Sequence, residues 1–101
     1  MTLAVLSLRA QRDLASAVRW IAKDNQTAAR GLRDAISAAA ERIGAHPQIG
    51  VVRLDVADEP MRFLSLAGYP YVVVYNADLS PPLILRVLHG ARDLPSVLRT
   101  P

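Results

Sequence analysis

The sequence predicts an α+β protein: an N-terminal strand, then an antiparallel helical hairpin packed on a small, mainly antiparallel sheet. Apolar residues recur at helical spacing from residue 10 to residue 43, with one interruption at Asp24-Asn25. Short apolar runs separated by turn residues then follow between residues 61 and 88. A chain of 101 residues has the length of one domain, which we place at residues 1–101.

The first 25 residues contain the signals for a strand and a helix. Residues 2–7 have the composition of a short strand, and Ser7 is placed to cap the following helix. That helix has its apolar residues in one stripe: Ala10, Leu14, Ala17, Val18 and Ile21. We assign Trp20 to the core as its only indole. Asp24 and Asn25 break the helix, and Asn25 can cap the next one.

The second helix also has one apolar stripe, formed by Ala29, Leu32, Ile36, Ala39, Ala40 and Ile43. Gly44 is the expected C′ residue after the helix, and Pro47 prevents its continuation. Because the connection between the helices is very short, they should form an antiparallel hairpin. The many alanines let the two backbones approach closely.

The second half of the chain predicts an antiparallel meander. Residues 49–60 are expected to form a loop in which Val51–Leu54 can make a short strand. Three strands are then expected at Met61–Leu66, Tyr71–Asn76 and Leu83–Leu88. The N-terminal strand can join the edge of this sheet.

Composition and charge exclude several classes of function. The chain has no Cys, and its two histidines are far apart, so we expect no disulfide, no metal site and no cofactor. The net charge of +3 lies in residues 1–50 without a basic run. An acidic or amphipathic protein partner therefore fits at least as well as a nucleic acid. With no signal-peptide order and no apolar run of about 20 residues, we expect a cytoplasmic protein.

Two arginines lie in the expected strands. Arg62 begins one strand, and Arg86 lies within another whose alternation places Leu83, Leu85 and Val87 on one face and Ile84, Arg86 and Leu88 on the other. An Arg within an apolar strand needs a carboxylate, a carbonyl or water. Arg86 is therefore either a charge packed at an open sheet face or a contact to a partner.

The last expected strand ends in the polar cluster His89-Gly90-Ala91-Arg92-Asp93. His89 could act as a general acid or base, but the only titratable partner nearby is Asp93. Alternatively, Arg92 and Asp93 anchor the C-terminal segment, where Leu94, Val97 and Leu98 are apolar at helical spacing. The chain contains no phosphate-binding loop, HExxH motif or nucleophile elbow, so we expect a binding protein rather than an enzyme.

A set of short motifs in a particular order resembles the ParE/RelE superfamily of toxins, and its ParE branch above all. The motifs are Arg12-Asp13-Leu14, Trp20–Asn25, Thr27-Ala28-Ala29, His46–Gly50, Arg62, Tyr69–Tyr75 and Leu85–Leu94. The resemblance implies the toxin of a type II toxin–antitoxin module, with a ParD-like antitoxin that wraps it. It also implies DNA gyrase as the target.

RelE-type relatives, which cut messenger RNA on the ribosome, are the alternative, as is a non-toxic member that only binds its antitoxin. Those ribonucleases carry several basic residues on the middle strands, where this chain has Phe63, Leu64 and Leu66. Leu98 lies about where their terminal Tyr or His would fall. The candidate target- or partner-binding residues are Arg62, Arg86, His89, Arg92, Leu94 and Leu98.

Overall fold

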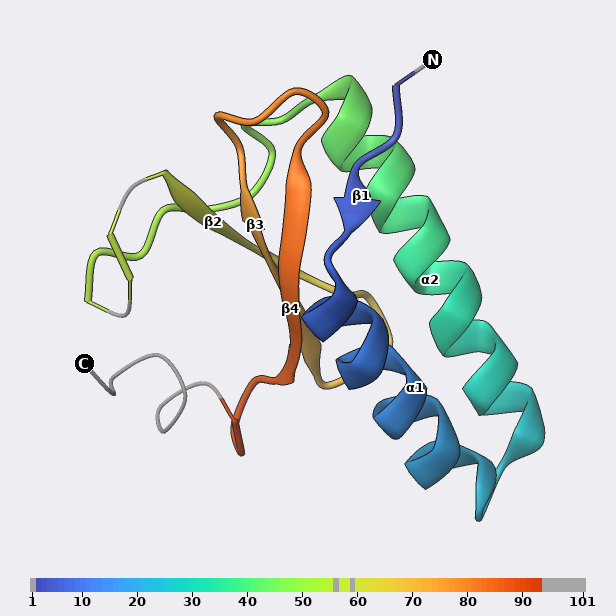
Figure 1. Ribbon diagram of the computed structural model, residues 1–101. Coiled ribbons are helices and arrows are strands. Elements are labelled where there is room, and N and C mark those ends of the chain that lie inside the picture. Colours follow the sequence, from blue (N-terminus) through green and yellow to red (C-terminus); the bar gives the residue numbers. More distant parts are fainter. Residues whose placement is uncertain (1, 56, 59, 94–101) are drawn as a thin grey trace.

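A helical hairpin covers one face of a four-stranded sheet, as Figure 1 shows for the computed structural model. The structure describes residues 2–55, 57–58 and 60–93. Its elements in chain order are β1 (Val5–Leu6), α1 (Leu8–Ala22), α2 (Gln26–Ala45), β2 (Met61–Ser65), β3 (Tyr71–Asn76) and β4 (Leu83–His89). The strand order is β1-β4-β3-β2, with β1 parallel to β4 and the other pairs antiparallel. The predicted α+β class, the hairpin and the meander are confirmed.

Both predicted helix caps are present. The Ser7 hydroxyl accepts a hydrogen bond from the Ala10 N–H (3.1 Å), and the Asn25 side chain accepts one from the Ala28 N–H (2.9 Å). Ser7 also donates from its hydroxyl to the Leu85 carbonyl at 3.1 Å. The start of α1 is therefore tied to β4. Neither helix in the described ranges is long and apolar enough to cross a membrane.

The prediction that Gly44 follows the end of α2 is wrong, because the helix continues to Ala45 and His46 is its cap. A different requirement explains this glycine. A Cβ at position 44 would lie 2.8 Å from the carbonyl carbon of Thr2 and 2.9 Å from the Cα of Leu3. The N-terminal segment runs along this part of α2, where the Ala4 N–H donates to the Ala40 carbonyl at 3.0 Å. Gly44 thus permits two backbones to touch.

The main core lies between the hairpin and the sheet and includes the fully buried Leu32, Ile43, Val73, Tyr75 and Ile84. Trp20 is not part of it: 62% of this residue is exposed. Position 20 lies on the flank of the α1 stripe, outside the face that packs on α2 and the sheet. Three other residues, Phe63, Val74 and Leu88, form a smaller cluster.

A β-bulge changes the alternation expected in β4. Val74 pairs with Arg86 and Tyr75 pairs with Ile84, so Leu85 is an extra residue in β4. Ile84 and Val87 consequently both belong to the main core, although strict alternation places them on opposite faces. The expected short strand at Val51–Leu54 is reduced to one bridge, between Val51 and Phe63.

The loop after α2 is held by the buried hydroxyl of Tyr75. This hydroxyl donates to the Pro47 carbonyl at 2.6 Å and accepts from the Gly50 N–H at 2.8 Å. A Cβ at Gly50 would lie 2.8 Å from the same hydroxyl, so this position requires glycine. Burial raises the pKa of the Tyr75 phenol, which therefore stays protonated and able to donate at neutral pH.

Tyr75→Phe should lower the free energy of unfolding by about 1–3 kcal/mol, because it leaves the Gly50 N–H buried without its acceptor. Urea unfolding measures this loss. Tyr69→Phe is the control, since the Tyr69 hydroxyl makes one bond, to the Ala28 carbonyl, in a half-buried setting. An unfolding midpoint of Tyr75→Phe above that of Tyr69→Phe would contradict the expected order.

Candidate functional site

Arg86 is bound within the protein, by a carboxylate of α1. Asp13 Oδ2 accepts from Arg86 Nε at 2.8 Å, and Asp13 Oδ1 accepts from Arg86 Nη2 at 3.2 Å. Oδ2 also accepts from the Val87 N–H at 3.0 Å. Both charged side chains are less than a fifth exposed. The structure shows Arg86 as a charge held within the protein by its ion pair with Asp13. Contact of Arg86 with a partner stays a prediction.

Two carboxylates cap the free edge of β4, since β1 pairs only with Leu83 and Ile84. The Val87 N–H donates to Asp13, and the His89 N–H donates to Asp93 Oδ2 at 2.9 Å. Unpaired edge N–H groups invite the addition of another strand. At this edge the Asp13 and Asp93 carboxylates accept from the N–H groups of Val87 and His89, so these two groups are not available to an added strand.

His89 is fixed by several contacts at the end of β4. Its Nδ1 accepts from the Arg92 N–H at 3.2 Å, so the neutral ring carries its proton on Nε2. The ring meets Tyr71 edge to face, with centroids 5.5 Å apart. Asp93 Oδ2 accepts from the backbone N–H of His89. Among the hydrogen bonds of the described residues, none joins a carboxylate to the imidazole in the way that orients a catalytic histidine.

Arg92 and Asp93 form an ion pair at the surface. Arg92 Nε donates to Asp93 Oδ1 at 3.0 Å, and the Arg92 side chain is 59% exposed. Hydrogen bonding from the Arg92 guanidinium holds the pKa of Asp93 below its usual value, and the His89 N–H adds to this effect. Asp93 therefore stays ionised at neutral pH and keeps its cap on β4.

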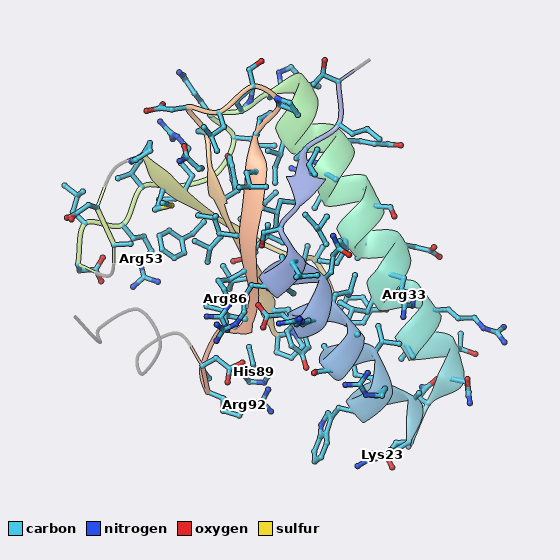
Figure 2. The ribbon with its side chains drawn as sticks, in the orientation of Figure 1. Lys23, Arg33, Arg53, Arg86, His89 and Arg92 are labelled. Carbon is cyan, nitrogen blue, oxygen red and sulfur yellow. The ribbon has the colours of Figure 1, made fainter. Side chains whose placement is uncertain are left out.

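A hollow of about 250 Å³, which we call the β4-end cleft, lies beside the Arg92–Asp93 ion pair. Its walls include Asp13, Ser16 and Trp20 from α1, and Tyr71, Val87 and Arg92 from the sheet side. Figure 2 shows Arg86, His89 and Arg92 together at this end of β4. Trp20 is largely exposed, and the Lys23 Nζ lies 5.0 Å from its ring centroid. The cleft therefore combines exposed aromatic and cationic groups.

Arg62 lies elsewhere. It pairs with Tyr75, near one end of the sheet, whereas His89 pairs with Tyr71 at the other end. Its Nη1 donates to the carbonyls of Gly50 (2.8 Å) and Gln48 (3.3 Å). Arg62 therefore does not join Arg86, His89 and Arg92 in one site. Leu94 and Leu98, the two other candidates, lie outside the described residues.

Sequence reasoning missed two members of the β4-end cleft. Asp13 was not matched to Arg86, and Trp20 was assigned to the core. The signal that could have found them is the spacing of positions 13, 16, 17 and 20, which places them on one flank of a helix. In the described part of the chain, no group of three or more His, Cys, Asp or Glu side chains is placed to hold a metal ion.

The hairpin on a mixed sheet with a parallel N-terminal edge strand is the RelE/ParE type of fold. The chain belongs to the family described as the ParE toxin of the type II toxin–antitoxin system parDE, whose sequence model matches residues 4–94. A solved structure of the chromosomal ParDE toxin–antitoxin system from P. aeruginosa is similar, with a TM-score of 0.61 and 17% identity. The match covers 88% of this chain and 96% of that one. No curated protein matches the chain.

Proposed function

We propose that this chain is the toxin of a ParDE module, that a ParD-like antitoxin neutralises it, and that the free toxin inhibits DNA gyrase by protein contacts in the cytoplasm. The family match over residues 4–94 is the main support. The solved ParDE system supports a partner of the same kind, through the shared fold.

The β4-end cleft supports binding as the mode of action. Trp, Tyr and Arg dominate the binding energy of protein interfaces, and Trp20, Tyr71 and Arg92 line this cleft. Cleavage of RNA at a 2′-OH needs a base, an acid and neutralisation of the phosphate charge. Near the cleft, the His89 imidazole is a candidate base or acid and the Arg92 guanidinium a candidate phosphate contact, whereas Arg86 is tied to Asp13. These two residues support the RelE-like alternative.

The charge of the helical hairpin favours an acidic partner. Residues 1–50 contain seven Lys or Arg and four Asp or Glu, and one of those carboxylates, Asp13, is already paired with Arg86. Leu3, Val5 and Leu8 are exposed apolar residues near the N-terminus. An acidic amphipathic segment complements both features. We therefore propose that the antitoxin binds through an acidic amphipathic segment.

Co-purification with the protein of the adjacent reading frame tests the antitoxin proposal. An interface of standard size buries about 1,600 Å², and a segment that folds as it wraps can bury more. At a concentration of 100 times Kd, binding adds about 2.7 kcal/mol to the stability of the toxin. Calorimetry should therefore show heat of binding and a higher melting temperature. The absence of both a heat of binding and a shift in melting temperature would overturn the antitoxin proposal.

Arg92→Ala should weaken gyrase inhibition roughly thirtyfold, because truncating a central Arg costs about 2 kcal/mol. His89→Ala should leave inhibition largely unchanged. Arg53→Ala is the matched control: it removes another exposed Arg that pairs with a nearby Asp, at 3.0 Å from Asp55. Supercoiling by purified gyrase is the readout.

A parallel assay of messenger RNA on translating ribosomes separates the alternatives. Codon-positioned cuts that disappear in His89→Ala, with gyrase unaffected, would favour the endoribonuclease. Antitoxin binding without effect on gyrase or RNA would favour a non-toxic member. Equal inhibition by wild type, Arg92→Ala and Arg53→Ala would remove Arg92 from the target surface.

A further inference from the structure

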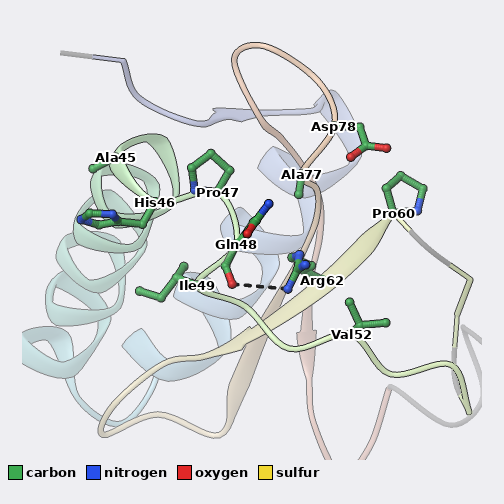
Figure 3. Close-up of a pocket in the computed structure, with 10 residues that line it drawn as sticks. All are labelled: Ala45, His46, Pro47, Gln48, Ile49, Val52, Pro60, Arg62, Ala77 and Asp78. Carbon is green, nitrogen blue, oxygen red and sulfur yellow. Dashed lines mark hydrogen bonds between the residues drawn. The ribbon is translucent and has the colours of Figure 1, made fainter.

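A larger pocket, of about 690 Å³, lies where α2 ends and the loop to β2 begins. We call it the α2-end pocket, and Figure 3 shows its walls. Much of the lining is apolar, with Pro47, Ile49, Val52 and Pro60. Its titratable side chains are those of His46, Arg62 and Asp78. The pocket belongs neither to the β4-end cleft nor to the main core.

Arg62 is held firmly within this pocket. Its Nη1 donates to two carbonyls, those of Gly50 and Gln48 (Figure 3 marks the bond to Gln48). The loop that supplies them is fixed by the Tyr75 hydroxyl, which binds both Pro47 and Gly50. The guanidinium is thus oriented before any ligand arrives, so a ligand need not order it.

The hydrogen-bond partners of the Arg62 guanidinium in the described part of the chain are uncharged carbonyl groups. Among residues 2–55, 57–58 and 60–93, no carboxylate lies within ion-pair distance of its guanidinium. Both of its hydrogen bonds use Nη1, so Nε and Nη2 have no acceptor in the described part of the chain. A half-buried guanidinium with two unused donors complements a carboxylate, which can accept from both.

We propose that the α2-end pocket binds an acidic side chain of a peptide segment. The Glu or Asp carboxylate accepts from Arg62, and apolar side chains beside it pack on Ile49, Val52 and Pro60. The apolar wall favours a peptide over a small inorganic anion, which would leave that wall wet. The proposal does not rest on the proposed function, because a peptide from any protein with this chemistry meets these requirements.

Asp78 restricts the pocket to a single carboxylate. Its exposed side chain contributes a negative charge, opposite in sign to that of Arg62. A polyanion such as nucleic acid requires a row of cations, which these two opposite charges do not provide. Asp78 should also weaken the binding of any acidic ligand by repulsion.

Amide NMR of the full chain with two blocked pentapeptides tests the proposal. The peptides are Ac-Ala-Leu-Glu-Leu-Ala-NH2 and its Gln counterpart, with inorganic phosphate as a third probe. The NMR signals of the Gly50 amide and the Arg62 Nε–H should shift when the Glu peptide binds. The Glu peptide should bind at least tenfold more tightly than the Gln peptide. No shift, or equal shifts with both peptides, would overturn the proposal. If phosphate at the same concentration reproduces the shifts, the pocket binds anions in general rather than an acidic peptide.

Arg62→Gln should abolish the difference between the two peptides, whereas Arg53→Gln, outside the pocket, should preserve it. If Arg62→Gln fails to fold, Asp78→Asn decides, because it alters an exposed residue and leaves Arg62 in place. Asp78→Asn should bind the Glu peptide about two- to threefold more tightly and leave the Gln peptide unchanged. Unchanged binding of the Glu peptide would count against the carboxylate contact.

Discussion

Asp13→Ala should lower the free energy of unfolding by about 3 kcal/mol, at the lower end of the range for breaking one partner out of a buried ion pair. The Asp13 carboxylate accepts from Arg86 Nε, Arg86 Nη2 and the Val87 N–H. Since the Arg86 side chain is 18% exposed, water can replace only part of these bonds. A loss of this size shifts the melting temperature of a 100-residue domain by more than about 10 °C.

Asp34→Ala is the matched control, because it removes an exposed carboxylate from the middle of α2. It should change stability by less than about 0.5 kcal/mol. The pair Asp13→Leu with Arg86→Met should recover part of the loss, since no charge is then left without its partner. Similar urea midpoints for Asp13→Ala and Asp34→Ala would show that the ion pair does not stabilise the fold.

The elements of the fold could be predicted because their signals are local. Ser7 and Asn25 precede apolar periodicity and cap their helices as expected. The errors arose where a distant segment decides the outcome. Gly44 is required by the passing backbone of Thr2, and the bulge at Leu85 is a property of the pairing with β3. Neither can be derived from neighbouring residues.

The candidate site could be predicted only in part, for the same reason. Sequence alone indicated that Arg86 needs a carboxylate, but the partner is Asp13, 73 positions away. His89 and Arg92 do lie together, because they are close in the chain. Arg62 was grouped with them by residue type, yet strand pairing places it near the opposite end of the sheet. Residue type indicates chemistry, and register decides which groups meet.

Gly44→Ala should destabilise the protein by about 3 kcal/mol or more, although alanine favours a helix interior by about 1 kcal/mol over glycine. The added Cβ would meet the backbone of Thr2 and Leu3, which cannot rotate away as a side chain can. The N-terminal segment would have to leave α2, breaking the Ala4 bond to Ala40 and displacing β1 from β4.

Gly31→Ala in the same helix supplies the comparison for Gly44→Ala. Its Cβ would meet the hydroxyl of Tyr69, the end of a side chain that can move. The loss at position 31 should therefore be smaller, and Tyr69→Ala should remove the clash. No side-chain change should rescue Gly44→Ala, because backbone atoms cause its clash. Urea unfolding gives both losses, and hydrogen exchange should show the Ala4 and Val5 amides unprotected in Gly44→Ala. A Gly44→Ala protein at least as stable as wild type, with those amides still protected, would mean that the N-terminal segment does not run against α2.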